Sequence, residues 1–146
     1  MRICIDSNQF IFGISGTDPA SETLMLLLPS LEVVLPRLVM KEVTSNLDDA
    51  QAKALYALLN KAPRVQVIDG PVPAALVTKY VNLGLSEKAD ALIGAFVEWQ
   101  GAVYLVSDNQ HFLSDLVGAA FEVLRPEEFI HQYYRAIALA ESKGRE

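Results

Sequence analysis

Residues 2–8 read RICIDSN, and a similar arrangement returns late in the chain as YLVSDN at residues 104–109. In both segments a mostly apolar run carries an aspartate to its carboxyl end, Asp6 in the first and Asp108 in the second. Such runs predict buried strands, and parallel neighbours would set the two ends at one edge of a sheet. Taken alone, Asp6 could equally cap a turn, and Asp108 could equally be the N-cap of the helix that follows it. The presence of an aspartate at the end of both strands favours one site to which both residues contribute.

The rest of the chain alternates between predicted strands and helices, without an internal repeat, low-complexity segment or linker. This alternation predicts an α/β fold, a three-layer α/β/α arrangement with a central parallel sheet. Ligands of such sheets bind outside the carboxyl ends of the strands. Ser86 is expected to cap the helix that follows it. Strands are predicted at residues 2–6, 31–35, 65–68, 102–106 and 121–124, and helices at 21–28, 49–61, 74–83, 87–99 and roughly 110–117, with others opening at Pro36 and Pro126.

The composition fits one compact domain over residues 1–146, because 51% of the residues are hydrophobic and can fill a core. The most apolar stretch, residues 24–40, is interrupted by two prolines and two charged residues, so no membrane span is expected. The single cysteine, Cys4, excludes an internal disulfide and is expected to be a small buried hydrophobe. With no charged-then-apolar leader at the start, the expected location is the cytoplasm.

Two further acids lie in predicted helices. Asp90 stands one turn into the helix at 87–99, beside its apolar stripe, and Gly94 at i+4 is expected to leave the space above the carboxylate open. A first-turn acid favoured by the helix dipole is the ordinary explanation for such a residue. Glu42 lies between Met40 and Val43, where a solvent-facing glutamate would be equally ordinary. Spacing alone leaves the role of both acids open.

Together, four segments resemble the PIN-domain family, and the resemblance runs over the whole chain. They are ICIDSN at residues 3–8, PRLVMKEV at 36–43, GLSEKADALIGA at 84–95 and YLVSDNQHF at 104–112. Each motif is weak alone, but the order and spacing fit the family as well as the residue types do. The resemblance implies a parallel-sheet α/β/α fold with an acidic cluster that binds Mg²⁺ or Mn²⁺.

The positions that match this catalytic and metal-binding cluster, with its usual polar neighbours, are Asp6, Glu42, Asp90 and Asp108, followed by Ser7, Asn8 and Ser107. Converging carboxylates repel one another unless cations lie between them. Oxygen ligands suit Mg²⁺ or Mn²⁺, and the absence of a cysteine or paired-histidine cluster argues against zinc. Such metal ions generate hydroxide for attack on a phosphate ester and stabilise the leaving oxygen.

One position departs from the family. Many relatives carry an additional acid just before the phenylalanine of the SDxxxF stretch, where this chain has His111. We expect His111 to pack at the start of a helix, with contact to a phosphate as the alternative. If the missing acid contributes to a second metal site elsewhere in the family, a two-metal mechanism is less secure here.

Within the family, a small domain of this kind resembles the VapC-like toxin half of a VapBC-type toxin–antitoxin pair, an endoribonuclease. The resemblance implies an RNA substrate, a cognate antitoxin and a homodimer. The apolar residues of the last helix are expected to pack on the core, with a dimer or antitoxin interface as the alternative. These residues are Phe129, Ile130, Tyr133, Tyr134 and Ile137.

The net charge of −6 gives no positive support for nucleic-acid binding, because phosphate contacts use Lys and Arg. Without the four proposed metal-binding acids the balance is 14 acidic against 12 basic residues, so bound cations would remove most of the excess. Two alternatives to a nuclease are a receiver-like signalling module and a catalytically quiet PIN-like scaffold. The first would carry paired acids after its first strand and a lysine after a late one, whereas here Asp6 stands alone and Ser107-Asp108 replaces any lysine.

Overall fold

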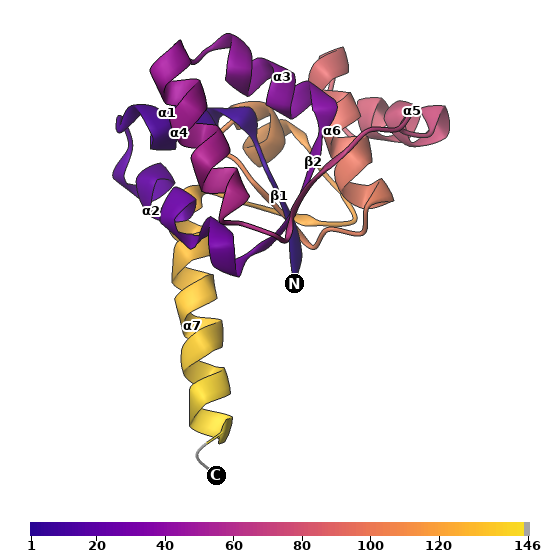
Figure 1. Cartoon of the computed structure of the whole chain (residues 1–146). Helices are drawn as coiled ribbons and strands as arrows, with labels where there is room; N and C mark the ends of the chain where they lie inside the picture. Colours follow the sequence, from indigo (N-terminus) through magenta and orange to yellow (C-terminus); the bar gives the residue numbers. More distant parts are fainter. Residues whose placement is uncertain (145–146) are drawn as a thin grey trace.

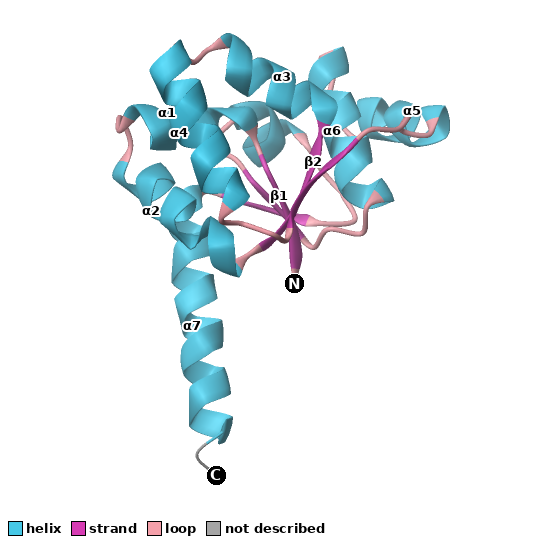
Figure 2. Ribbon diagram, viewed as in Figure 1, coloured by secondary structure: helices cyan, strands magenta, loops and turns pink. Residues whose placement is uncertain are grey.

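Five short strands form a parallel sheet in the computed structural model, which describes residues 1–144. The strands are β1 (Arg2–Ile5), β2 (Glu32–Pro36), β3 (Val65–Ile68), β4 (Tyr104–Val106) and β5 (Glu122–Leu124). They lie in the order β3-β2-β1-β4-β5, and every neighbouring pair is parallel. Helices flank the sheet on both sides, as Figure 2 shows. The predicted α/β fold with a central parallel sheet is confirmed.

The helices are α1 (Ser7–Ser15), α2 (Pro19–Leu27), the 3-10 turn η1 (Leu28–Ser30), α3 (Arg37–Ser45), α4 (Asp49–Asn60), α5 (Ala74–Asn82), α6 (Lys88–Trp99), the π-helical turn η2 (His111–Asp115) and α7 (Pro126–Gly144). α1 packs against α2 and α4 on one side of the sheet, and α5 packs against α6 on the other (Figure 1). None of the helices within residues 1–144 has the length and hydropathy needed to cross a bilayer.

The order of the strands creates a switch point beside β1. The chain runs from β1 outward through β2 to β3 and then returns to the other side of β1 to form β4. The register pairs Ile5 with Val106, and the backbone N–H of Asp6 donates to the Val106 carbonyl at 2.9 Å. The residues that follow β1 and β4 therefore meet at the carboxyl edge of the sheet, where open α/β sheets bind their ligands.

Helix α1 was not predicted, because its inward face does not follow an apolar helical period. Its buried residues are Ser7, Gln9 and Phe10, two of which are polar. Asp6 occupies its N-cap position and accepts a hydrogen bond from the backbone N–H of Ser7. The aspartate at the end of the first strand therefore caps a helix, whereas the sequence offered the cap of a turn as the alternative to a site.

The start of α6 and the segment after β4 also differ from the prediction. α6 begins at Lys88 with Glu87 in the N-cap position and no side-chain cap, so the expected cap at Ser86 is wrong. The segment predicted as a helix at roughly 110–117 is the single π-helical turn η2. The peptide N–H of Val117 instead donates to the carbonyl of Leu83 at 3.0 Å, so the chain turns back toward the α5–α6 loop at this point.

The last helix extends away from the body of the domain (Figure 1). Only Pro126 and Phe129 of α7 are buried, whereas Tyr134 and Ile137 keep 51% and 37% of their surface exposed. The expectation that this apolar face packs on the core is correct for Phe129 and Tyr133 and wrong for Tyr134 and Ile137 in the later turns. A helix without tertiary contacts is marginal in water, so these turns depend on their own propensity or on a partner.

Gly84 is expected to tolerate no side chain. Its φ of +121° is a conformation that side chains disfavour, and an added Cβ would collide with the carbonyl oxygen of Asp115 in η2. We predict that Gly84→Ala lowers the free energy of unfolding by about 3 kcal/mol or more, measured by urea denaturation.

The matched control is Gly101→Ala. Gly101 also has a positive φ, +66°, but nothing lies within 4 Å of its added Cβ. This variant should lose only about 1 kcal/mol from backbone strain. Equal losses in the two variants would show that the contact between Gly84 and η2 does not contribute to stability.

Candidate active site

Asp6 is the most deeply buried acid of the candidate site, with 4% of its surface exposed. One carboxylate oxygen, Oδ1, accepts a hydrogen bond from the backbone N–H of Ser7 at 2.8 Å. The other, Oδ2, accepts from the Ser107 hydroxyl at 2.8 Å. The carboxylate is thus held in one orientation by donors that follow β1 and β4, the two strands of the switch point.

Glu42 reaches the same place from helix α3. Its Oε2 atom accepts a hydrogen bond from the Ser7 hydroxyl at 2.8 Å. Ser7 therefore connects Asp6, through its backbone, with Glu42, through its side chain. The hydroxyls of Ser7 and Ser107 thus each contact a carboxylate of the candidate site, and Glu42 faces the site rather than solvent alone.

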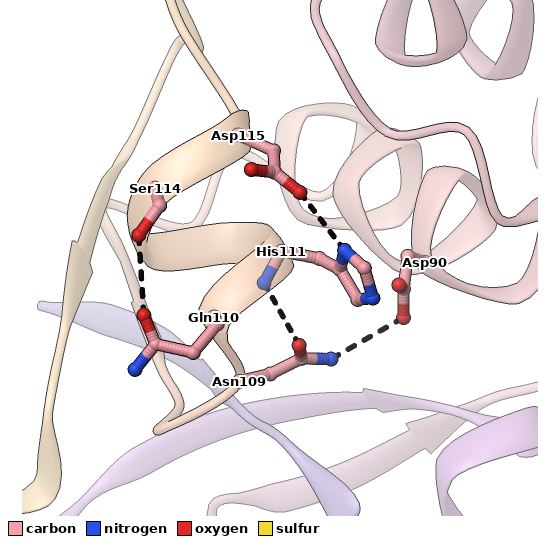
Figure 3. A network of polar contacts seen from close by, with 6 residues as sticks. All are labelled: Asp90, Asn109, Gln110, His111, Ser114 and Asp115. Carbon is pink, nitrogen blue, oxygen red and sulfur yellow. Dashed lines mark hydrogen bonds and ion pairs between the residues drawn. The ribbon is translucent and has the colours of Figure 1, made fainter.

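Asp90 of α6 is the third acid, and its charge acts on Asp6; Figure 3 shows it beside Asn109. The amide of Asn109 donates to its Oδ1 atom across a long 3.5 Å contact. Asn109 also accepts from the backbone N–H of His111 at 3.0 Å, so it ties the start of η2 to α6. Asn109 lies inside the SDN motif, but no role was predicted for it from the sequence. Its contact with Asp90 is visible only in the structure, because the sequence does not show which element faces α6.

His111 is the first residue of the helical turn η2, in line with the expected place at a helix start. Its ring is half exposed and its Nδ1 atom lies 2.9 Å from a carboxylate oxygen of Asp115, one helical turn later. In Figure 3 the ring stands between Asp115 and Asp90. The hydrogen bond with Asp115 raises the pKa of the imidazole, and the negative charge of Asp90 adds to this effect.

Burial and the charge of Glu42 both raise the pKa of Asp6 and of Asp90. Burial is the largest cause that raises the pKa of Asp6, and the charges of Glu42 and Asp90 raise it further, against the lowering effect of the Ser107 and Ser7 hydrogen bonds. Burial also raises the pKa of Asp90, where Glu42 again adds to the effect and His111 opposes it. Within residues 1–144, neither lysine nor arginine forms an ion pair with any of these acids.

Asp108 and Asn8 stand apart from this group. Asp108 is partly exposed and lines a hollow formed with Phe12, Thr17 and Arg125. Ser107, not Asp108, is the residue after β4 whose side chain binds Asp6. Asn8 is exposed on α1. The metal-binding role of Asp108 and the polar role of Asn8 stay predictions.

Gly94 does not leave open space above Asp90. An added Cβ would lie 2.9 Å from Tyr80 Cδ1 and 3.0 Å from Leu85 Cδ1, so the expectation is wrong. Gly94 instead allows α6 to approach Tyr80 of α5 closely. Its place in the motif reflects helix packing.

The donor set suits a hard divalent cation. In the described part of the chain, no three His, Cys, Asp or Glu side chains are already arranged around one metal position. Without a cation between them, however, like charges keep apart, and Mg²⁺ takes only one or two protein carboxylates directly while retaining waters. Asp6, Glu42 and Asp90 suit this requirement, because they are neighbouring carboxylates that form no ion pair with a lysine or arginine of residues 1–144.

Solved structures from several organisms share this architecture. A chain of VapBC2 from Rickettsia felis, bound to a DNA fragment from the promoter, is 18% identical with a TM-score of 0.57 over 86% of this chain and 98% of that chain. A chain of FitAcB from Neisseria gonorrhoeae is 20% identical with a TM-score of 0.58 over 85% and 97%. The fold is PIN-like. PAE2754 from Pyrobaculum aerophilum also matches, at 15% identity and a TM-score of 0.57 over 90% and 94%.

No protein-family model and no curated protein matches the sequence. At identities of 15–20% the likeness concerns the PIN-like fold alone. The chemistry of the candidate site therefore has to be argued from its own residues.

We predict that Asp6→Asn stabilises the protein when divalent cations are absent. Because the folded-state pKa of Asp6 is raised, its contribution to stability is present at low pH and is lost as pH rises through that pKa. At neutral pH the neutral amide should therefore raise the free energy of unfolding by about 1 kcal/mol. The difference should vanish in acid, where Asp6 is protonated, and thermal unfolding at both pH values measures it.

Mn²⁺ should reverse this order. A cation that binds only the folded protein, at a hundredfold excess over its Kd, stabilises it by about 2.7 kcal/mol. The wild type should gain this stability on addition of MnCl₂, and Asp6→Asn should lose most of the gain. A metal-induced shift of the same size in both proteins would exclude Asp6 as a ligand.

Proposed function

We propose that this chain is a metal-dependent nuclease of the PIN type, an endoribonuclease. The observation that carries the proposal is the meeting of Asp6, Glu42 and Asp90 at the switch point of the sheet, without an ion pair to any lysine or arginine of residues 1–144. Carboxylates with raised pKa values in a ligand-binding position, here Asp6 and Asp90, favour a catalytic role over a structural one. The PIN-like fold supports the same reaction class by analogy.

In this proposal the metal is Mg²⁺ or Mn²⁺, bound by Asp6, Glu42, Asp90 and Asp108 directly or through water. When bound, it supplies an activated water and neutralises charge on the phosphate. Ser7 and Ser107 keep the Asp6 oxygens in place by the hydrogen bonds described above. Asn109 orients Asp90, and Asn8 is proposed as a polar contact to the substrate from the exposed side of α1.

We propose RNA as the substrate and toxin action, countered by a cognate antitoxin in the cytoplasm, as the biological role. The support is the likeness of the fold to chains of the VapBC and FitAcB complexes. The main competing function is a catalytically quiet PIN-like module, and the cleavage assay below decides between them.

We predict Mn²⁺-dependent cleavage of single-stranded RNA by the wild-type protein. Asp6→Asn and Glu42→Gln should each lower the rate by at least about a hundredfold, because each removes one negative charge from the metal site. Asp49→Asn is the matched control, since Asp49 lies in the first turn of α4, outside the candidate site, and its variant should cleave at the wild-type rate. Cleavage by Asp6→Asn at that rate would contradict the proposal.

We also propose that the protein forms a homodimer through the exposed apolar face of α7. Tyr134 and Ile137 lie three residues apart and share one face of this helix, with 51% and 37% of their surface exposed. Sedimentation at micromolar concentration should give a dimer, and Ile137→Lys should give a monomer. Leu26→Lys, on an α2 side chain that is 78% exposed, should remain dimeric. A monomeric wild type would contradict this assembly.

A further inference from the structure

The hollow lined by Asp108 opens at the carboxyl edge of the sheet, one strand beyond the switch point. It has a volume of about 390 Å³ and lies between the end of α1 and the start of α7, within the size range of ligand sites. The register pairs Val106 with Leu124, and the backbone N–H of Ser107 donates to the Leu124 carbonyl at 2.9 Å. Asp108 and Arg125, which follow these residues, both line the hollow, so its wall adjoins the candidate active site.

Phe12 supplies an aromatic ring to this hollow. It is only partly exposed on α1, yet it does not belong to the hydrophobic core cluster or to the residues packed against it. Within residues 1–144 its ring pairs with no other aromatic ring. A partly exposed phenylalanine that lines a hollow can offer a flat apolar surface, and bases of single-stranded nucleic acids stack on such rings.

Arg125 supplies a cation to the same hollow. Arg2 and Arg37 form ion pairs with Glu32 and Asp69, whereas the exposed Arg125 side chain makes neither an ion pair nor a hydrogen bond with residues 1–144. A guanidinium with all its donors free suits a phosphate group, which it can bind through two parallel hydrogen bonds.

Three acidic residues, Asp18, Asp108 and Glu127, line the hollow together with Arg125. Asp18 caps α2, and its Oδ2 atom already accepts from the backbone N–H and the hydroxyl of Ser21 at 3.1 and 2.6 Å. Glu127 lies in the first turn of α7, where the helix dipole favours a negative charge, and Asp108 is one of the metal ligands proposed above. Among residues 1–144, Arg125 is the only basic residue that lines the hollow, so phosphate binding there depends on this side chain.

We propose that this hollow binds a nucleotide of single-stranded RNA next to the cleaved phosphodiester, with its base on Phe12 and its phosphate on Arg125. This proposal rests on the endoribonuclease function proposed above. It places the substrate strand along the carboxyl edge of the sheet, from the three acids past Asp108 to the end of β5. Within residues 1–144 the hydroxyl of Thr17 makes only long hydrogen bonds of 3.4 and 3.5 Å, which leaves it available to the sugar or phosphate.

Binding of a labelled single-stranded oligoribonucleotide to the non-cleaving Asp6→Asn protein, in MnCl₂, tests this site. Adding Phe12→Ala should raise the Kd about tenfold. Phe12→Trp should instead keep the Kd of the parent protein, because phenylalanine and tryptophan rings can both stack on a base. Adding Arg125→Gln should also weaken binding about tenfold and flatten the dependence of log Kd on log salt by about 0.7, the value for one phosphate contact on a single strand. Arg125→Lys should keep the salt dependence.

The matched controls are Tyr56→Ala and Lys53→Gln, exposed residues of α4, which should leave the Kd unchanged. Thermal unfolding of each variant confirms that it is folded. If the wild type cleaves RNA but the Phe12 and Arg125 variants bind as tightly as their parent, the nucleotide site is overturned while the nuclease function stands. If these variants weaken binding as expected but the wild type does not cleave, the nuclease function fails and the nucleotide site stands.

Discussion

The arrangement of the strands around the site depends on the burial of one carboxylate, that of Asp6. A carboxylate with 4% of its surface exposed requires hydrogen-bond donors on both oxygens, and these come from Ser7 after β1 and Ser107 after β4. The two donors can meet only if β1 and β4 are parallel neighbours with the observed register. The strand order, the start of α1 and the path of the chain after β4 are all consistent with this single requirement.

The same spacing of aspartate and glutamine is used in two different ways in the chain. Asp48 and Gln51 form a complete capping box at the start of α4, which stabilises the helix. Asp6 and Gln9 have the same spacing, but the backbone N–H of Asp6 is bound to Val106 and its carboxylate is bound to the two serines. The side-chain amide of Gln9 is buried and has no hydrogen-bond partner among residues 1–144, which lowers the stability of the fold. The local rule for helix caps thus gives way to the needs of the site, as is usual at functional positions.

Much of the architecture was predictable from the sequence, because the strands of a parallel sheet are apolar runs and their ends carry the polar residues. Helix α1 was not, since its buried face includes Ser7 and Gln9. The directions of the side chains at the site also could not be predicted from the sequence. The sequence made Asp6 and Asp108 an equivalent pair, whereas the fold pairs Asp6 with Ser107 and turns Asp108 toward Phe12 and Arg125. The role of Gly94 could not be inferred either, because it depends on how closely α6 approaches Tyr80 and Leu85.

Cys4 lies in the middle of β1, two residues before the buried acid, and is completely inaccessible to solvent. Burial raises the pKa of its thiol, and the charge of Asp6 raises it further, so no reactive thiolate exists in the folded chain. It is the chain's single cysteine. A thiol reagent can therefore label the protein only after the central strand has separated from its neighbours. The rate of labelling measures how often the sheet opens, at the strand whose end carries Asp6.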